Sequence, residues 1–221
     1  MATLVAFGVG PDQLAAREGD FEDITHFIRS IEPPCWSLTR LDGAKAGRGE
    51  VMFNATCASC HGVHTGPSAK YPNTVVERAE VGTDPIRAER FRSTEANYLN
   101  ASWFGQPPLT STGGYLAQPL TGVWARAPYF HNGSVPDLLG VLDPAKRPTR
   151  WKRAGSEVGD YDTDRVGFRY ETVDAAPDPS TRGGRLVYDT TRAGMGNGGH
   201  RYGEKLTDSE RSDLLEYLRG L

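Results

Sequence analysis

The chain has 221 residues, a length that favours one main domain with a sizeable insertion or appendage. Its 26 glycines and 15 prolines predict a globular protein with much of its length in turns and loops. Because 25 Lys and Arg residues face 28 Asp and Glu residues, the net charge of −3 offers no basic surface and argues against DNA or RNA binding.

The longest apolar run near the start, residues 2–10, is shorter than the roughly 20 residues that span a bilayer. It also lacks the basic region and the small-residue cleavage site of a secretory signal. We therefore expect no membrane span. At face value the chain is cytosolic, an expectation that the chemistry described below reverses.

Apolar residues recur at helical spacing between residues 20 and 31, which predicts an amphipathic helix that stops before Pro33 and Pro34. We assign residues 1–40 to an N-terminal segment, the remnant of a preceding domain or a linker. Cys35 lies in it and is left over, because three cysteines make no disulfide framework.

A second helix is predicted over residues 44–56 and leads directly into Cys57-Ala58-Ser59-Cys60-His61. Two thiols at this spacing reach the two vinyl groups on one edge of a porphyrin, and the histidine that follows can bind the iron. The motif therefore predicts one covalently attached haem c held by Cys57, Cys60 and His61.

Two other sites share this spacing. A structural zinc site needs a second pair of closely spaced ligands, for which Cys35 and a distant histidine are poor candidates. A redox-active dithiol normally follows a strand and begins a helix, whereas the segment before Cys57 is itself predicted to be helical.

The region between the motif and the end of the chain is rich in Gly, Pro, Ser, Thr, Asp and Arg. It contains short helical signals at residues 89–97 and 135–142 and one strand signal at residues 185–190. Its many aromatic residues predict ordered loops around something large and apolar, rather than a disordered linker. These residues are Tyr98, Trp103, Phe104, Tyr115, Trp124, Tyr129, Phe130 and Trp151.

The last helix is signalled by "LTDSERSDLLEYLRGL". Thr207 and Glu210 form a capping box, and Leu214, Leu218 and Leu221 share one face with Tyr217 beside them.

Gly49 and Phe53 before the motif, together with Leu214 and Tyr217 in the last helix, resemble the c-type cytochrome fold, where the first and last helices cross at such residues. "TGVWARAPYFHNGSVPDLLGVL" resembles the segment after the second haem motif of bacterial di-haem cytochrome c peroxidases and, more closely, of rubber-oxygenase-like proteins. "IRSIEPP", "KRPTRWKRAG" and "GNGGHRYGEKLTDSERSDLLEYLRGL" share the resemblance.

The resemblance implies the C-terminal, electron-transfer haem domain of those proteins, without their catalytic half. The expected fold is mainly α: a cytochrome c-like helical domain over residues 41–221, with a long loop-rich insertion at about residues 65–190. One departure is Asn132, where the peroxidases commonly have Asp. Another is the lack of a methionine in the helix that follows, from which the peroxidases take their sixth ligand.

Five residues are candidates for the sixth iron ligand: His26, His64, His131, Met195 and His200. His64 follows the proximal motif by only about 10 Å of chain and cannot cross to the other face of the ring. His26 is expected to be a surface or packing residue. His200 ends "AGMGNGGH", where glycines permit close approach of backbone to a flat ring, and the resemblance places a distal haem histidine here. We favour His200 and keep Met195, His131 and an open site as alternatives.

Four further residues are candidate contacts of the cofactor. Trp124 and Tyr129 are expected to line the haem or to face a second haem domain. Arg150 and Trp151 are candidates for holding the propionates. Each of the four is also an ordinary packing or surface residue in the competing interpretation.

The predicted function is that of a mono-haem c-type cytochrome domain with two histidine ligands, which exchanges single electrons with a redox partner protein or a second haem domain. The alternative is a peroxidase or oxygenase with an open iron site, and a third is a zinc-stabilised interaction module. Because the families that it resembles attach haem outside the cytoplasmic membrane, we expect a periplasmic or secreted location. The missing signal then implies a fragment or an incorrectly assigned start.

Overall fold

The computed structural model describes residues 11–64, 70–90, 110, 112–175 and 178–221. They fall into two units, residues 1–33 with 88–112 and residues 34–87 with 113–221. Several parts of the sequence analysis lie outside the described residues: the apolar run 2–10, residues 91–97 of one helical signal, and the aromatic residues Tyr98, Trp103 and Phe104.

In the smaller unit the described elements are α2 (Pro11–Ala15) and α3 (Glu18–Ser30). The amphipathic helix predicted near residues 20–31 is confirmed as α3. It ends at Ser30, because Ile31 is already extended ahead of the two prolines. Its apolar face carries exposed side chains, among them Phe27 and Ile28.

The helix α7 (Ile86–Arg90) crosses the sequence boundary between the units. In the larger unit the α-helices are α4 (Gly43–Thr56), α5 (Ala58–His61), α6 (Arg78–Val81), α9 (Leu138–Leu142), α10 (Arg182–Arg185) and α11 (Asp208–Arg219). Three turns of 3-10 helix are η2 (Val123–Arg126), η3 (Pro144–Lys146) and η4 (Val158–Asp160).

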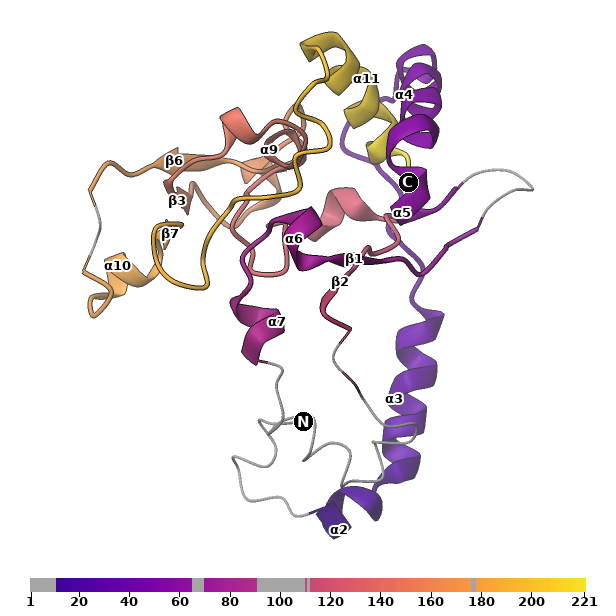
Figure 1. Cartoon of the computed structure of the whole chain (residues 1–221), viewed down its shortest axis with the longest axis vertical. Helices are drawn as coiled ribbons and strands as arrows, with labels where there is room; N and C mark the ends of the chain where they lie inside the picture. The colour runs from indigo at the N-terminus through magenta and orange to yellow at the C-terminus, as the bar shows by residue number, and fades with distance from the viewer. Residues whose placement is uncertain (1–10, 65–69, 91–109, 111, 176–177) are drawn as a thin grey trace. The chain divides into compact units, whose positions relative to one another are not determined.

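The helices α4 and α11 pack side by side, as Figure 1 shows. Their contact depends on Gly49, because a Cβ atom there would lie 2.1 Å from the backbone oxygen of Asp213. One turn later the rings of Phe53 and Tyr217 meet at 5.2 Å between centroids. The crossing expected from the sequence is therefore confirmed.

Caps fix where both helices begin. The Asp42 side chain accepts hydrogen bonds from the backbone N–H groups of Ala44 and Lys45 at the start of α4. At α11, Glu210 N–H donates to Thr207 Oγ1 and Thr207 N–H donates to the Glu210 carboxylate, which confirms the predicted capping box.

The strands form small antiparallel sheets. β1 (Val75–Glu77) pairs with β2 (Gly114–Leu116), and β4 (Tyr161–Asp162) pairs with β5 (Gly167–Phe168). The third sheet has the order β6-β3-β7, from Tyr170–Thr172, Arg150–Arg153 and Tyr188–Asp189. With 40% helix and 13% strand the fold is mixed rather than mainly α, because the insertion contributes sheets where loops were expected.

The short elements of the insertion also differ in extent from the sequence signals. The helix expected over residues 135–142 is confined to α9, because the Asp137 side chain accepts a hydrogen bond from Gly140 N–H and caps it there. The strand expected over residues 185–190 begins only at Tyr188, after the turn of α10. The buried core of this unit joins α4, α9 and α11 through Phe53, Leu138 and Leu214.

Candidate functional site

The motif residues lie on the single helical turn of α5. Cys57 ends α4, where its N–H donates to the Phe53 carbonyl oxygen, and it begins α5, where its own carbonyl accepts from His61 N–H. Cys57 and Cys60 are both free thiols and partly buried. Gly62 ends the turn at φ = 85°, where a Cβ would lie 2.4 Å from the Lys70 carbonyl oxygen. The turn therefore presents two thiols and one imidazole from adjacent positions.

The His61 ring is oriented by a backbone group from the insertion. Its Nδ1 donates to the Gln118 carbonyl oxygen at 2.7 Å. This hydrogen bond assigns the proton to Nδ1 and leaves the lone pair on Nε2, as in metal-bound histidines that are held by an outer partner. Gln118 is delivered by the sheet, since Ala117 N–H, directly after β2, donates to the Thr74 carbonyl before β1.

The structure brings His200 to His61. Their ring centroids are 6.2 Å apart. A ligating nitrogen lies about 2.0–2.1 Å from its metal and the ring centre roughly 1.2 Å behind it, so opposite imidazole ligands of one metal have centroids about 6.4 Å apart. The separation of these two rings fits a pair of axial ligands with one iron between them.

The backbone of His200 is held in an unusual conformation. Its φ of 46° lies in the left-handed region, which non-glycine residues rarely adopt. Its N–H donates to the Val81 carbonyl oxygen at 2.6 Å, at the end of α6. Gly199, at φ = 76°, lies against Gly82, and a Cβ atom on Gly199 would come within 2.2 Å of the Gly82 carbonyl carbon.

Both imidazoles are neutral at neutral pH. Burial, and then the nearby His61 and Arg147, lower the pKa of His200 to about 4. Burial also lowers the pKa of His61, against the opposing effect of the Gln118 carbonyl. Metal ligation requires the unprotonated imidazole, so both side chains are in the form that binds iron. Nδ1 of His200 is buried without a hydrogen-bond partner among the described residues.

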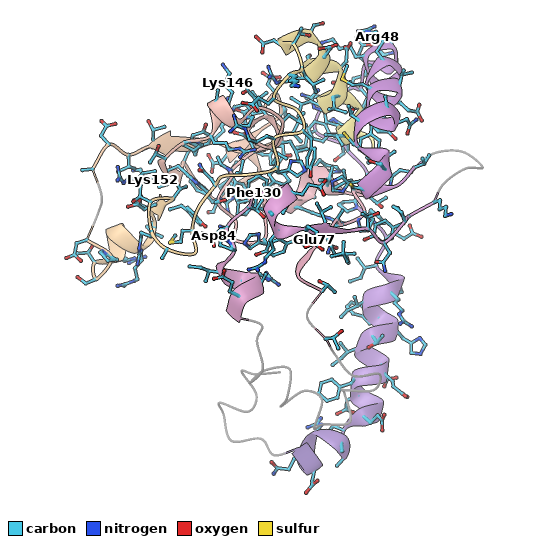
Figure 2. All side chains as sticks on the ribbon, in the orientation of Figure 1. Arg48, Glu77, Asp84, Phe130, Lys146 and Lys152 are labelled. Carbon is cyan, nitrogen blue, oxygen red and sulfur yellow. The ribbon has the colours of Figure 1, made fainter. Side chains whose placement is uncertain are left out.

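Aromatic side chains surround His200. The ring of Phe130 lies 5.9 Å from that of His200, and the ring of Tyr202 lies 5.1 Å from it in an edge-on arrangement. Phe130, which Figure 2 labels, is partly buried in the larger unit. Phe130 has a φ of 67°. The guanidinium carbon of Arg147 lies over its ring, 4.9 Å from the ring centroid. Such walls suit a flat, largely apolar group.

The residues therefore fit a haem: two thiols at one helical turn, two imidazoles whose centroids lie 6.2 Å apart, and an aromatic wall. Residues 114–152 match the family model described as RoxA-like, cytochrome c-like. Over this segment the chain matches a RoxA-like, cytochrome c-like domain. The matched segment includes Gln118, which holds His61, and both Phe130 and Arg147, which surround His200. The resemblance that the sequence analysis stated is confirmed at this level.

Two proteins of Sinorhizobium fredii (strain NBRC 101917 / NGR234) are similar to the chain. The uncharacterized protein y4iM is 30% identical over 89% of this chain and 52% of its own length. The uncharacterized protein y4iJ is 32% identical over 63% of this chain and 22% of its own length. The chain thus spans about half the length of y4iM and a smaller share of y4iJ.

The other candidates for the sixth ligand lie in different surroundings. The ring of His131 stacks on that of Tyr115 at 4.5 Å, and its carbonyl accepts a hydrogen bond from Arg87. The ring of His64 lies 5.8 Å from that of Phe53. His26 is exposed on α3, and Met195 lies in a turn closed by its N–H to the Arg192 carbonyl.

Trp124 and Tyr129 make packing contacts and hydrogen bonds within the larger unit. Trp124 Nε1 donates to the Pro34 carbonyl at 2.9 Å, and its ring meets that of Trp36 edge-on at 5.2 Å. Tyr129 is buried, and its hydroxyl donates to the carbonyls of Val123 and Val166. Their roles at a cofactor or a second domain stay predictions.

Arg150 and Trp151 lie in β3. Arg150 pairs with Asp189 at 3.1 Å across to β7. The Trp151 indole is buried, donates from Nε1 to the Ser134 carbonyl and stacks on the ring of Tyr188 at 5.6 Å. These contacts of Arg150 and Trp151 are with this sheet and with Ser134. The residues that contact His61 and His200 are different ones. Propionate binding by Arg150 and Trp151 stays a prediction.

The sequence analysis missed Gln118, Val81 and Arg147. The first two act through backbone carbonyls, for which side-chain identity gives no signal. Arg147 lies within the "KRPTRWKRAG" segment, in which the sequence predicted a cofactor role only for Arg150 and Trp151. Among all the described residues, no helix has both the length and the apolar character to cross a bilayer, and no group of three or more His, Cys, Asp or Glu residues is arranged to hold a metal ion.

Proposed function

We propose that this RoxA-like domain is a mono-haem c-type cytochrome that carries single electrons. Cys57 and Cys60 would hold the haem through thioether bonds, and His61 and His200 would hold its iron. The observation that carries the proposal is the facing pair of neutral imidazoles, 6.2 Å apart, with the attachment thiols on the same helical turn as one of them.

When bound, haem c supplies a reversible one-electron couple. The residues of the chain hold and orient it. The Gln118 carbonyl would strengthen His61 as a ligand by accepting a hydrogen bond from its Nδ1–H, and Phe130 and Tyr202 cover His200 with largely apolar surface. If both histidines hold the iron, neither peroxide nor oxygen would have a free position there, which favours electron transfer over catalysis.

The partner would be a redox protein or a second haem domain, and the location periplasmic or secreted. The chain covers only about half of y4iM, so that relative has room for a further domain beside the matched part. Covalent attachment through free thiols supports a location where haem ligation takes place, since the resembled families attach haem outside the cytoplasmic membrane.

The test is the absorbance spectrum of protein produced with haem attached, oxidised and reduced, with and without carbon monoxide. The expected parent spectrum is low-spin and unchanged by carbon monoxide. His200→Ala should become high-spin and bind carbon monoxide, whereas the matched control His131→Ala should behave as the parent. Cys57→Ser with Cys60→Ser should lose the haem on denaturation, which tests the attachment separately.

The alternative, a peroxidase or oxygenase with an open iron, predicts a parent protein that already binds carbon monoxide or cyanide. That result would overturn the electron-carrier proposal and make peroxide turnover the next assay. If the spectrum of His200→Ala is unchanged and His131→Ala gains carbon monoxide binding instead, the sixth ligand is His131 and not His200.

A further inference from the structure

Arg147 lies next to the distal ligand and donates hydrogen bonds to backbone carbonyls of two separate segments. Its Nε donates to Gly140 at 2.7 Å and its Nη2 to Val141 at 3.2 Å, both in α9. Its Nη1 donates to Asn197 at 2.7 Å and to Gly199 at 2.8 Å. A further bond, from Nη2 at 3.3 Å, goes to the carbonyl of His200 itself.

These acceptors tie the loop of residues 197–200 to α9. The carbonyls at the end of a helix have no partners within the helix, and the loop carbonyls are not in a sheet, so both segments need external donors. A guanidinium provides five N–H donors in a rigid planar fork, which no other side chain can match. Burial lowers the pKa of Arg147 to about 10, still far above neutral, so the side chain stays charged.

The loop needs this support because His200 is strained. A non-glycine residue in the left-handed region persists only where its surroundings over-determine it. The N–H side of His200 is fixed by the Val81 carbonyl and its C=O side by Arg147. Without Arg147, only one of these two anchors would remain.

Arg147 also fixes the aromatic wall of the site. Its guanidinium carbon lies 4.9 Å from the centroid of Phe130, and the ring of Phe130 lies 5.9 Å from that of His200. One side chain thus contacts the backbone of the distal ligand and the ring that packs beside it.

We propose that Arg147 is the positioning residue that holds His200 in place as the sixth ligand. This inference rests on the function proposed above. Arg147 acts through His200 and does not itself touch the iron. A residue with a merely structural role would affect the stability of the fold but would leave the coordination of the folded protein unchanged.

The experiment compares Arg147→Gln and Arg147→Lys with the matched control Arg201→Gln, all produced with haem attached. Arg201 lies next to the distal histidine, but its side chain is 65% exposed and pairs with Glu204. The readouts, well below the unfolding temperature, are spin state, carbon monoxide binding to the reduced protein, and hydrogen exchange of the amides in residues 197–200.

In Arg147→Gln, carbon monoxide binding and loop exchange should rise by about tenfold or more, the factor expected for losing even one hydrogen bond to a charged donor. Arg147→Lys should be intermediate, because an ammonium keeps the charge but reaches fewer carbonyls. Arg201→Gln should match the parent. Gly49→Ala, a destabilising change at the crossing of α4 and α11, should leave the spin state unaltered.

In one outcome the parent is low-spin and Arg147→Gln keeps the parental coordination and the parental hydrogen exchange. That result would overturn the positioning role of Arg147 and leave the electron-carrier proposal intact. If Gly49→Ala opens the iron as much as Arg147→Gln does, the effect is global and the inference is wrong. A parent that binds carbon monoxide overturns the proposed function itself. If Arg147→Gln does not fold, the same readouts on Arg147→Lys decide the question.

Discussion

The rings of His61 and His200, which are far apart in the sequence, lie with their centroids 6.2 Å apart, and the same small sheet supports both. The carbonyl of Gln118, two residues beyond β2, accepts a hydrogen bond from Nδ1–H of His61. Val81, which ends the helix directly after β1, accepts the N–H of His200. The β1–β2 pair thus connects the two faces of the proposed haem site, so the insertion is part of the site rather than an addition to it.

Replacing Gly49 by Ala should destabilise the protein. The added methyl would lie 2.1 Å from the Asp213 backbone oxygen, so α4 and α11 would have to separate. Overpacking of this kind costs about 1–3 kcal/mol, which exceeds the gain in helix propensity from Gly to Ala. The measurement is the free energy of unfolding of the haem-loaded protein in guanidinium.

Gly47 provides the control, since it lies in the same helix and a Cβ there would meet nothing within 4 Å. Gly47→Ala should stabilise the protein by about 0.5–1 kcal/mol through helix propensity alone. Equal effects of the two substitutions would show that the close crossing does not limit stability.

Replacing Thr207 by Ala should remove the cap of α11. The N–H of Glu210 would lose its acceptor, at a cost of about 1 kcal/mol in the free energy of unfolding. Thr207→Ser keeps the hydroxyl and should stay close to the parent. Chemical unfolding of the three proteins makes the comparison, and an Ala variant as stable as the Ser variant would contradict it.

The Arg48–Asp213 pair between α4 and α11 should make stability depend on acid pH. Figure 2 shows Arg48 at the α4 side of this contact, and Arg48 Nε donates to Asp213 at 2.7 Å. The hydrogen bond from Arg48 holds the pKa of Asp213 below its ordinary 3.8. A depressed folded-state pKa stabilises the fold above the unfolded pKa, and this contribution is lost as pH falls through the folded value.

The melting temperature of Asp213→Asn should therefore lie below that of the parent at neutral pH, and the gap should narrow below pH 3.8. In an Arg48→Gln background the same substitution should have a smaller effect at neutral pH, because the partner is gone. A gap that stays constant with pH would mean that ionisation of Asp213 does not contribute.

The sequence predicted the helices and the meeting of His61 with His200 because those signals are local or carry distinctive chemistry. The capping box of Thr207 and Glu210 and the spacing of Gly49 and Phe53 act within a few residues. The three-residue strands β1 and β2 are too short for an alternating pattern, and their pairing joins distant segments. The sheets, and with them the mixed fold, therefore could not be read from the sequence.

The same reasoning separates the site residues that were found from those that were missed. His61 and His200 have a side chain suited to metals, whereas Val81 and Gln118 contribute only carbonyl oxygens. The role of Arg147 was not predicted, because it depends on how many backbone carbonyls the side chain reaches. Those carbonyls belong to α9 and to residues 197–200, two segments that meet only in the folded chain.

Replacing Gly199 by Ala should disturb the distal ligand while leaving its imidazole in the chain. A Cβ at this position would lie 2.2 Å from the carbonyl carbon of Gly82 and would require the φ of 76° that L-residues avoid. The loop should move away from α6 and draw His200 from the iron. The absorbance spectrum should show a high-spin fraction and new carbon monoxide binding.

Gly198 is the matched control one residue earlier. A Cβ there would meet only the Gly82 oxygen, at 3.9 Å, which is ordinary contact. Gly198→Ala should therefore keep the parental low-spin spectrum. If Gly199→Ala is also parental, the approach of this loop to α6 does not hold His200 in place. If both variants bind carbon monoxide, the whole loop is sensitive to substitution, and the close contact with Gly82 is not the feature that positions the ligand.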